Sequence, residues 1–253
     1  MNLGEPPRRL GPVQTKSKRL HVTSPGRRRP VGCWLVTRLI LVRHGESNVT
    51  VARIIGGPRT CSGLSDLGRR QAEQLRDRWA ADTEFSADVL VASQYMRAFE
   101  TAQIIAPALG DLPIERDAGF GEHDPGPECD GLTYQEFTDR YPAAADGWDS
   151  NDPFATTFPG GETVAAFHFR VGSALRRTLD AHEGGTIVVA CHGGVIDALL
   201  RQLLRAPAMG GFQAHAVNTS ISEFTLARPN LWRIDRYNDS AHLAGLPAHT
   251  NPG

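Results

Sequence analysis

The fold of this chain is decided by the stretch Leu39-Ile40-Leu41-Val42-Arg43-His44-Gly45-Glu46-Ser47. Its apolar run predicts a buried strand. The run ends abruptly in Arg43 and His44, so this strand delivers two polar side chains to its carboxyl end. In open α/β sheets, ligands bind outside the carboxyl ends of the strands. The stretch therefore predicts a strand of a central sheet and a site at the end of that strand.

The same pattern recurs near residue 190. Residues 186–191 form a second β-branched apolar run, and it too ends in a histidine and glycines, His192-Gly193-Gly194, before an apolar helix over 195–205. Between the two runs, a short strand over 88–92 ends at Ser93. Strands that alternate with helices predict a parallel sheet with both faces covered.

The other expected elements follow from periodicity and from capping residues. We expect helices over 65–79, 93–109, 133–141 and 162–182, a strand over 112–115, and a terminal hairpin or edge pair over 220–227 and 231–237. The glycine-rich residues 45–63 predict a flexible, substrate-facing loop. Residues 119–161, which are polar or rich in proline, predict an insertion or lid over the sheet.

The composition predicts one main folded domain, over residues 38–239. A chain of 253 residues that is 40% hydrophobic can bury one substantial core and is not disordered overall. No stretch reaches the roughly 18–20 apolar residues of a membrane span, and no secretory signal precedes Arg38. The four cysteines form no Cys-x-x-Cys pair, which argues against a disulfide framework or a structural zinc site and favours a cytoplasmic location. The glycosylation sequons at Asn48 and Asn218 are therefore read as chance.

The two ends of the chain differ from this domain. Residues 1–37 hold eight of the 27 Lys and Arg residues but only one of the 28 acids, Glu5, and they predict a basic, disordered leader. Three interpretations of the leader stay open: a tether to anionic surfaces, an organellar presequence, or an inert tail or start-site artefact with Val36 as the natural start. Residues 240–253 are expected to form a loose tail.

The residues at the strand ends predict a phosphate site. If the two strand ends are neighbours, one pocket holds Arg43, His44 and His192, together with Arg97 from the head of the helix after Ser93. Guanidinium groups and helix-start amides bind compact oxyanions, and arginine matches phosphate in a bidentate way. A neutral imidazole beside cations is also a nucleophile, so the pocket predicts transfer of a phosphoryl group to histidine.

Release of an alcohol from a phosphate ester also needs a general acid, a role worth about 10²- to 10⁴-fold in rate. A loop carboxyl near phosphate has its pKa raised toward a useful range. Glu122 is the best placed candidate by sequence, and Asp124 and Glu128 lie close enough in the chain to replace it.

Several linked motifs now carry a resemblance. They are Arg43-His44-Gly45-Glu46-Ser47, Arg97-Ala98 with Thr101-Ala102, Glu122, Pro159-Gly160-Gly161-Glu162 and Cys191-His192-Gly193-Gly194. In order and spacing the chain resembles the histidine phosphatase superfamily, in its phosphoglycerate-mutase-like branch, over about residues 38–228. The resemblance implies a three-layer α/β/α sandwich with a mostly parallel sheet.

The resemblance also implies roles for single residues. His44 takes the phosphoryl group while Arg43, Arg97 and His192 hold it. Glu122 protonates the leaving group and then activates the water that hydrolyses the phosphohistidine. Neither a metal nor a cofactor is required.

Further contacts to the phosphate ester are expected from the loop and the second strand end. We expect Ser47, Thr50 and Gly193 to bind the substrate together with Arg43 and Arg97. A substrate contact by Arg53 or Arg59, from the loop over 45–63, stays open.

Two departures from the family bear on the substrate. Many members carry an asparagine six residues after the nucleophile, where this chain has Thr50. Cofactor-dependent mutases resemble one another in a Trp-Asn pair there and in Glu-Arg-His-Tyr-Gly around the acid, whereas this chain has Val49-Thr50 and Glu122-His123-Asp124-Pro125-Gly126.

These departures favour a histidine acid phosphatase-type phosphoric monoester hydrolase that acts on small phosphorylated metabolites. A phosphoglycerate mutase or related phosphoryl transferase is the first alternative, and an inactive phosphate-binding adaptor is the second. The expected partner is a small phosphate ester and no specific nucleic acid, while a homodimer stays open.

Overall fold

The computed structural model describes Met1, residues 35–81 and residues 85–247. The expected leader up to residue 34 and the last six residues of the expected tail lie outside the described residues. Within the described part, no helix is both long enough and apolar enough to cross a membrane.

The centre of the fold is a sheet of six strands in the order β3-β2-β4-β1-β5-β6. Its strands are β1 (Thr37–Arg43), β2 (Val89–Ala92), β3 (Ile114–Arg116), β4 (Thr186–Cys191), β5 (Ile221–Arg228) and β6 (Leu231–Asp239). The first four run parallel, and β5 and β6 complete the sheet as an antiparallel pair. The mostly parallel sheet and its terminal hairpin are therefore confirmed.

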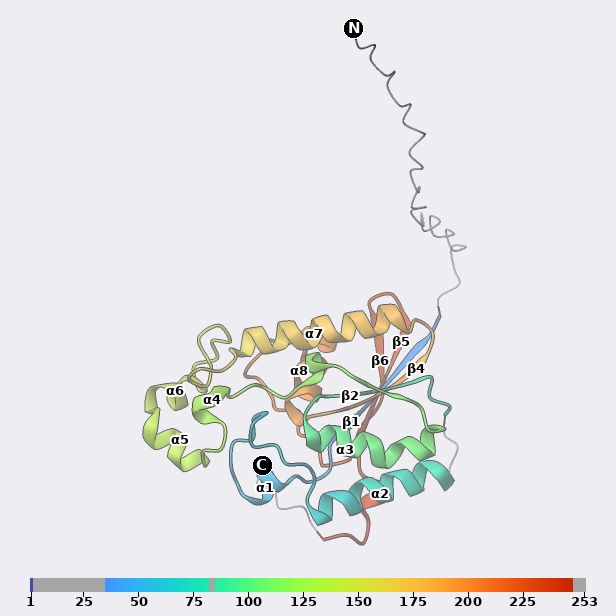
Figure 1. Cartoon of the computed structure of the whole chain (residues 1–253), viewed down its shortest axis with the longest axis horizontal. Helices are drawn as coiled ribbons and strands as arrows, with labels where there is room; N and C mark the ends of the chain where they lie inside the picture. Colours follow the sequence, from blue (N-terminus) through green and yellow to red (C-terminus); the bar gives the residue numbers. More distant parts are fainter. Residues whose placement is uncertain (2–34, 82–84, 248–253) are drawn as a thin grey trace. The chain divides into compact units, whose positions relative to one another are not determined.

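Helices cover both faces of this sheet (Figure 1). Successive side chains of a strand point to opposite faces, so β1 contributes to two cores. Leu39 and Leu41 belong to the core under α7 (Val164–Ala181) and α8 (Gly193–Leu204). Ile40 and Val42 belong to the core under α2 (Asp66–Ala81) and α3 (Met96–Ile105). The expected three-layer α/β/α sandwich is confirmed.

Shorter helices connect these elements. They are α1 (Asn48–Val51), η1 (Ala106–Leu109), η2 (Ala118–Phe120), α4 (Gly126–Cys129), α5 (Tyr134–Arg140), α6 (Pro142–Gly147) and η3 (Ala241–Leu243). The sequence predicted α5 but not α1 or α6, because a helix of one or two turns leaves too little periodicity to detect. Pro142 begins α6 at a position where a missing backbone N–H costs nothing.

Two segments that were predicted to be irregular have more internal packing than the sequence indicated. The segment predicted as a lid has its own small hydrophobic cluster, in which Phe137 and Phe158 pack beside Ile55 of the loop after β1. The start of the predicted loose tail is ordered, because the His242 side chain of η3 is buried against Thr219 at an Nε2–Oγ1 separation of 3.0 Å.

Two glycines bring the first turn of α2 against the segment that follows β1. A Cβ atom on Gly68 would lie 1.9 Å from the carbonyl oxygen of Glu46, and one on Gly45 would lie 2.4 Å from the carbonyl oxygen of Gly68. Both distances are shorter than any van der Waals contact, and the obstructing atoms are backbone. Only glycine therefore permits this approach, which fixes the backbone next to His44.

This contact predicts that Gly68→Ala destabilises the fold although alanine is the better helix former. The inserted methyl group must displace backbone, so we expect the free energy of unfolding to fall by about 1–3 kcal/mol. The matched control is Gly147→Ala in α6, where an added Cβ meets nothing within 4 Å. Urea unfolding followed by circular dichroism measures both variants. Equal stability of the two would contradict the proposed packing.

Candidate active site

The two predicted histidines lie side by side at the carboxyl ends of β1 and β4. Arg43 pairs with Cys191 in the last rung of the parallel ladder, so His44 and His192 leave the sheet at the same level. The backbone N–H of His44 donates to the carbonyl of Cys191 at 2.9 Å. The two imidazole rings meet edge to face with their centroids 5.0 Å apart, and both are buried.

Arg97 joins the two histidines. It lies in the first turn of α3, directly after β2, and its side chain is only 4% exposed. Its Nε–H points between His44 Nε2, at 3.2 Å, and His192 Nδ1, at 3.3 Å. The guanidinium also stacks over the ring of Tyr95 and donates through Nη1 to the carbonyl of Gly56. The site therefore holds a cation against two imidazole nitrogens that accept hydrogen bonds.

The hydrogen bonds of His44 fix its tautomer. Its Nδ1 lies 2.7 Å from the carbonyl oxygen of Gly45, which can only accept, so Nδ1 carries the proton. The lone pair is then on Nε2, the atom that faces Arg97. Burial lowers the pKa of His44 well below its ordinary value of 6.5, and the charges of Arg97 and Arg43 lower it further. His44 is therefore a neutral imidazole whose unprotonated Nε2 accepts a hydrogen bond from Arg97.

His192 has the opposite orientation. Its Nδ1 accepts from Arg97, and its Nε2 lies 2.8 Å from the hydroxyl of Ser93. Burial, followed by the charge of Arg97, also lowers the pKa of His192 well below 6.5. In the sequence, Ser93 was noted only as the residue that ends the strand now called β2 (Val89–Ala92). Its place at the carboxyl end of a strand was the signal that could have assigned it to the site.

Arg43 contributes a donor with no acceptor. Its Nη1 donates to the carbonyl of Ala216, but its Nε is buried and has no hydrogen-bond partner. Burial lowers the pKa of Arg43, and the charge of Glu122 opposes this effect. The position of a Cβ on Gly193 would lie 3.6 Å from this Nε. A buried unsatisfied donor is costly, so this part of the site, between Arg43 and the start of α8, favours an added acceptor such as an anion.

The Glu122 side chain extends from the loop after η2 to the start of α8. Its Oε2 accepts from the backbone N–H of Gly194 at 3.1 Å, and its Oε1 accepts from the N–H of His123 at 3.0 Å. A Cβ on Gly194 would lie 2.2 Å from Oε1, so the glycine makes room for the carboxylate. The structure thus brings Glu122 to the first turn of α8, two residues after His192, and close enough to Arg43 to act on its pKa.

The alternative acids lie elsewhere. Asp124 turns back to accept from the N–H of Gly126 at 2.9 Å, and the exposed Glu128 accepts from the hydroxyl of Tyr141 at 3.0 Å. Across residues 35–81 and 85–247, no group of three or more His, Cys, Asp or Glu side chains is arranged to hold a metal ion.

The loop after His44 places the other expected contacts less directly. The Ser47 and Thr50 hydroxyls hydrogen-bond to each other at 3.0 Å around the single turn of α1. Arg59 donates to the backbone carbonyl of the buried Asp130 in the lid, and Arg53 is exposed. Neither arginine hydrogen-bonds to His44 or His192, so a substrate contact by either stays a prediction.

Asn218 and Thr219 are site residues that sequence reasoning missed. The Asn218 amide donates to the carbonyl of His44 at 2.9 Å, and the Thr219 N–H donates to the carbonyl of Arg43 at 2.9 Å. Thr219 has φ +56°, which is unfavourable for a β-branched residue and is typical of functional sites. The signal was the polar triplet Asn218-Thr219-Ser220 just before a strand, which was read as a chance sequon.

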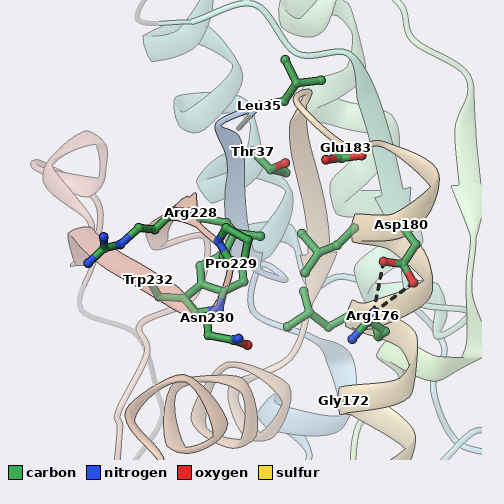
Figure 2. Close-up of a pocket in the computed structure, with 13 residues that line it drawn as sticks. Leu35, Thr37, Gly172, Arg176, Asp180, Glu183, Arg228, Pro229, Asn230 and Trp232 are labelled. Atoms are coloured by element: carbon green, nitrogen blue, oxygen red, sulfur yellow. Dashed lines mark hydrogen bonds and ion pairs between the residues drawn. The ribbon is translucent and has the colours of Figure 1, made fainter. Parts of the chain in front are cut away.

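A separate cavity of about 540 Å³ lies at the other end of β1 (Figure 2). Figure 2 shows it between α7, with the Arg176–Asp180 ion pair, and the turn that joins β5 to β6. Thr37, the first residue of β1, lines it, whereas the candidate active site follows the last residue of the same strand. None of the described residues that line this cavity belongs to the candidate site.

Comparison with known proteins accounts for this arrangement. The sequence pattern of the histidine phosphatase superfamily (branch 1) matches residues 39–240. The chain belongs to this superfamily. The match begins within β1 and includes the candidate site, the predicted lid and the terminal hairpin.

Individual known proteins are similar to this chain over most of its length. Phosphoglycerate mutase-like protein 4 of Arabidopsis thaliana is 35% identical and is aligned over 81% of this chain and 86% of its own length. The uncharacterized phosphatase PhoE of Bacillus subtilis is 31% identical over 83% of this chain and 99% of its own. The solved mycobacterial glucosyl-3-phosphoglycerate phosphatase in complex with VO3 has a TM-score of 0.65 at 26% identity, covering 79% of this chain and 98% of its own.

The lowered pKa values predict an acid-sensitive fold in the absence of phosphate. Below pH 6.5, the unfolded chain binds protons on His44 and His192 that the folded chain does not bind, so the free energy of unfolding falls as the pH falls. Each histidine contributes at most about 1.4 kcal/mol per pH unit. Urea unfolding in phosphate-free buffer between pH 7 and pH 5 measures the slope. His44→Gln should make it shallower, and an unchanged slope would contradict the lowered pKa of His44.

Proposed function

We propose that this protein is a phosphomonoesterase that hydrolyses small phosphorylated metabolites through a phosphohistidine on His44. The observation that carries the proposal is the unprotonated Nε2 of His44 beside the Arg97 guanidinium, next to the buried unsatisfied Nε of Arg43. A neutral nucleophile and two cations for a phosphoryl group thus lie close together at the end of β1. Membership of a superfamily of phosphatases and mutases supports chemistry on phosphate esters.

In the first step, the Nε2 lone pair of His44 attacks phosphorus and the bond from phosphorus to the ester oxygen breaks. Arg43 and Arg97 neutralise the charge on the equatorial oxygens. For this step Glu122 must take up a proton when the ester binds, and it gives that proton to the leaving alkoxide. Nδ1–H of His44 keeps its hydrogen bond to Gly45, which stabilises the positive charge that the imidazole gains.

In the second step, Glu122 acts as a base. It takes a proton from a water molecule, whose oxygen attacks phosphorus and breaks the phosphorus–nitrogen bond. Inorganic phosphate leaves, and His44 and Glu122 return to their starting protonation states. The same carboxyl group thus serves as acid and base in turn.

His192 can hydrogen-bond to the phosphate in either step because the Ser93 hydroxyl can bond to either tautomer of its ring. In the free protein, the His192 Nε2–H donates to the Ser93 hydroxyl. When phosphate takes the place of the Arg97 hydrogen bond, the proton on Nδ1 donates to a phosphate oxygen and the Ser93 hydroxyl donates to Nε2. A hydroxyl group is suited to this exchange because it both donates and accepts.

Hydrolysis is proposed over phosphoryl transfer because the Trp-Asn and Glu-Arg-His-Tyr-Gly sequences of the cofactor-dependent mutases are replaced here by Val49-Thr50 and by residues 122–126. One relative is named a phosphatase and another is named mutase-like, so the names of relatives leave the substrate open.

The nucleophile is tested by substitution. We expect the wild-type protein to release phosphate from a panel of phosphorylated metabolites and from 4-nitrophenyl phosphate, and to carry acid-labile phosphate after rapid quenching. His44→Ala should lose both properties, while His182→Ala, at the far end of α7, should keep them. Turnover that persists in His44→Ala would contradict the assignment of His44 as the nucleophile.

The alternatives are separated with 3-phosphoglycerate. We expect phosphate release to be at least as fast as isomerisation, with or without added bisphosphoglycerate. Faster isomerisation would instead identify a phosphoryl transferase that uses the same histidine. Failure of acid-labile phosphate to form with any substrate would favour the phosphate-binding adaptor.

A further inference from the structure

We propose that the ion pair between Arg170 and Glu162 positions the Glu122 carboxyl group for proton transfer, so that both residues act on the reaction through Glu122. The inference rests on the proposed function, because it presupposes that Glu122 is the acid. Arg170 was not singled out in the sequence, and Glu162 was noted only as the last residue of the Pro159-Gly160-Gly161-Glu162 motif.

Arg170 holds the backbone that leads into Glu122. From the second turn of α7, its Nη1 donates to the carbonyls of Gly119 at 3.0 Å, Gly121 at 3.1 Å and Ala118 at 3.3 Å. Its Nη2 donates to the carbonyl of Glu122 itself at 3.2 Å. One guanidinium thus bonds to four carbonyls, two in η2 and two in the residues that follow it. A planar, multiply donating group is suited to this task, and an ammonium group is not.

Glu162 holds both Arg170 and the backbone that leaves Glu122. Its two carboxylate oxygens accept from Nε and Nη2 of Arg170, each at 2.8 Å. Its backbone N–H donates to the carbonyl of Asp124 at 3.0 Å, and its carbonyl accepts from Nε2 of His123 at 2.7 Å. The pair therefore secures the chain on both sides of the proposed acid.

Gly161 of the motif and Gly126 of the loop after Glu122 allow this approach. A Cβ on Gly161 would lie 2.5 Å from the carbonyl oxygen of Asp124, and one on Gly126 would lie 2.3 Å from the carbonyl of Gly160. The two backbones are in direct contact here, and the side chain that follows Gly161 bonds to Arg170. The end of the motif thereby gains a physical reason: Gly161 permits the backbone contact, and Glu162 supplies a carboxylate for the guanidinium.

The pair is mostly buried, with the Arg170 side chain 28% and the Glu162 side chain 14% exposed. The hydrogen bonds and charge of Arg170 lower the pKa of Glu162 although burial opposes this, so the pair is ionised. Neither side chain hydrogen-bonds to His44, His192 or Arg97, although the charge of Arg170 adds a small part to the lowered pKa of His192. The hydrogen bonds of the pair therefore reach the proposed chemistry through the backbone around Glu122.

The experiment separates positioning of an acid from loss of structure. An ester with a good leaving group, such as 4-nitrophenyl phosphate, needs little protonation, whereas an alkyl phosphate needs the acid fully. The quantity measured is kcat/KM for both esters, since it reports phosphohistidine formation. For Arg170→Met we expect a fall of about 10²-fold with the alkyl ester, within the range of a lost general acid, and a change of less than about threefold with the aryl ester. Glu122→Gln should give the same pattern.

A double variant tests whether the two residues act as a unit. Glu122→Gln combined with Arg170→Met should be no slower on the alkyl ester than Glu122→Gln alone, because residues that act through one group are not additive. Arg170→Lys should recover part of the alkyl activity, since it keeps the charge but not the fork. The matched control is Arg176→Met on the same helix, whose arginine pairs with the exposed Asp180.

The outcomes are distinct. Equal losses on both esters in Arg170→Met and Arg170→Lys, or a double variant whose losses multiply, would overturn the positioning role. Arg170→Lys with wild-type activity on both esters would overturn it as well. A wild-type protein that forms no phosphohistidine, or a Glu122→Gln variant with no preference for the aryl ester, would instead count against the proposed function.

Discussion

The register of β1 against β4 is the constraint on which the site depends. Because Arg43 lies opposite Cys191, the residues that follow them leave the sheet together, and their imidazoles meet at 5.0 Å. A slip of one residue would send every side chain of β1 to the other face. Both faces of β1 are buried, with Leu39 and Leu41 in one core and Ile40 and Val42 in the other, so a slip would exchange side chains of different shape between two close-packed cores.

In the free protein, the positive charges of the site built on this register are only partly balanced. Arg43 and Arg97 lie close enough for each to lower the pKa of both histidines, and Arg43 keeps a buried donor without an acceptor. Glu122 offsets part of this positive charge, as its effect on Arg43 indicates. The remaining imbalance is relieved by an anion, so the same arrangement that costs stability favours a phosphate ester.

The central strands could be predicted from their continuous apolar runs, and the long helices from the periodic spacing of their apolar residues. The runs at residues 39–43 and 186–191 and the helix now called α7 are examples. The predicted lid could not be resolved into elements in the same way. Its helices α4 and α6 span four and six residues, and they are held by a cluster that joins residue 55 to residues 129–158. No local pattern encodes a contact over that separation.

The sequence by itself determined the sheet and its two polar strand ends, and it predicted the set Arg43, His44, Arg97 and His192, because these features depend on residue type and on position at the end of a strand or the start of a helix. It also predicted Glu122 in a loop, with Asp124 and Glu128 as alternatives. Only the tertiary structure decided which nitrogen of each histidine is unprotonated, and that the side chains of Asn218 and Arg170 bond to the carbonyls of His44 and Glu122. Those decisions rest on hydrogen bonds to main-chain carbonyls, such as those of Gly45, His44 and Glu122. Every residue has such a carbonyl, so no side-chain pattern reveals which one will be used.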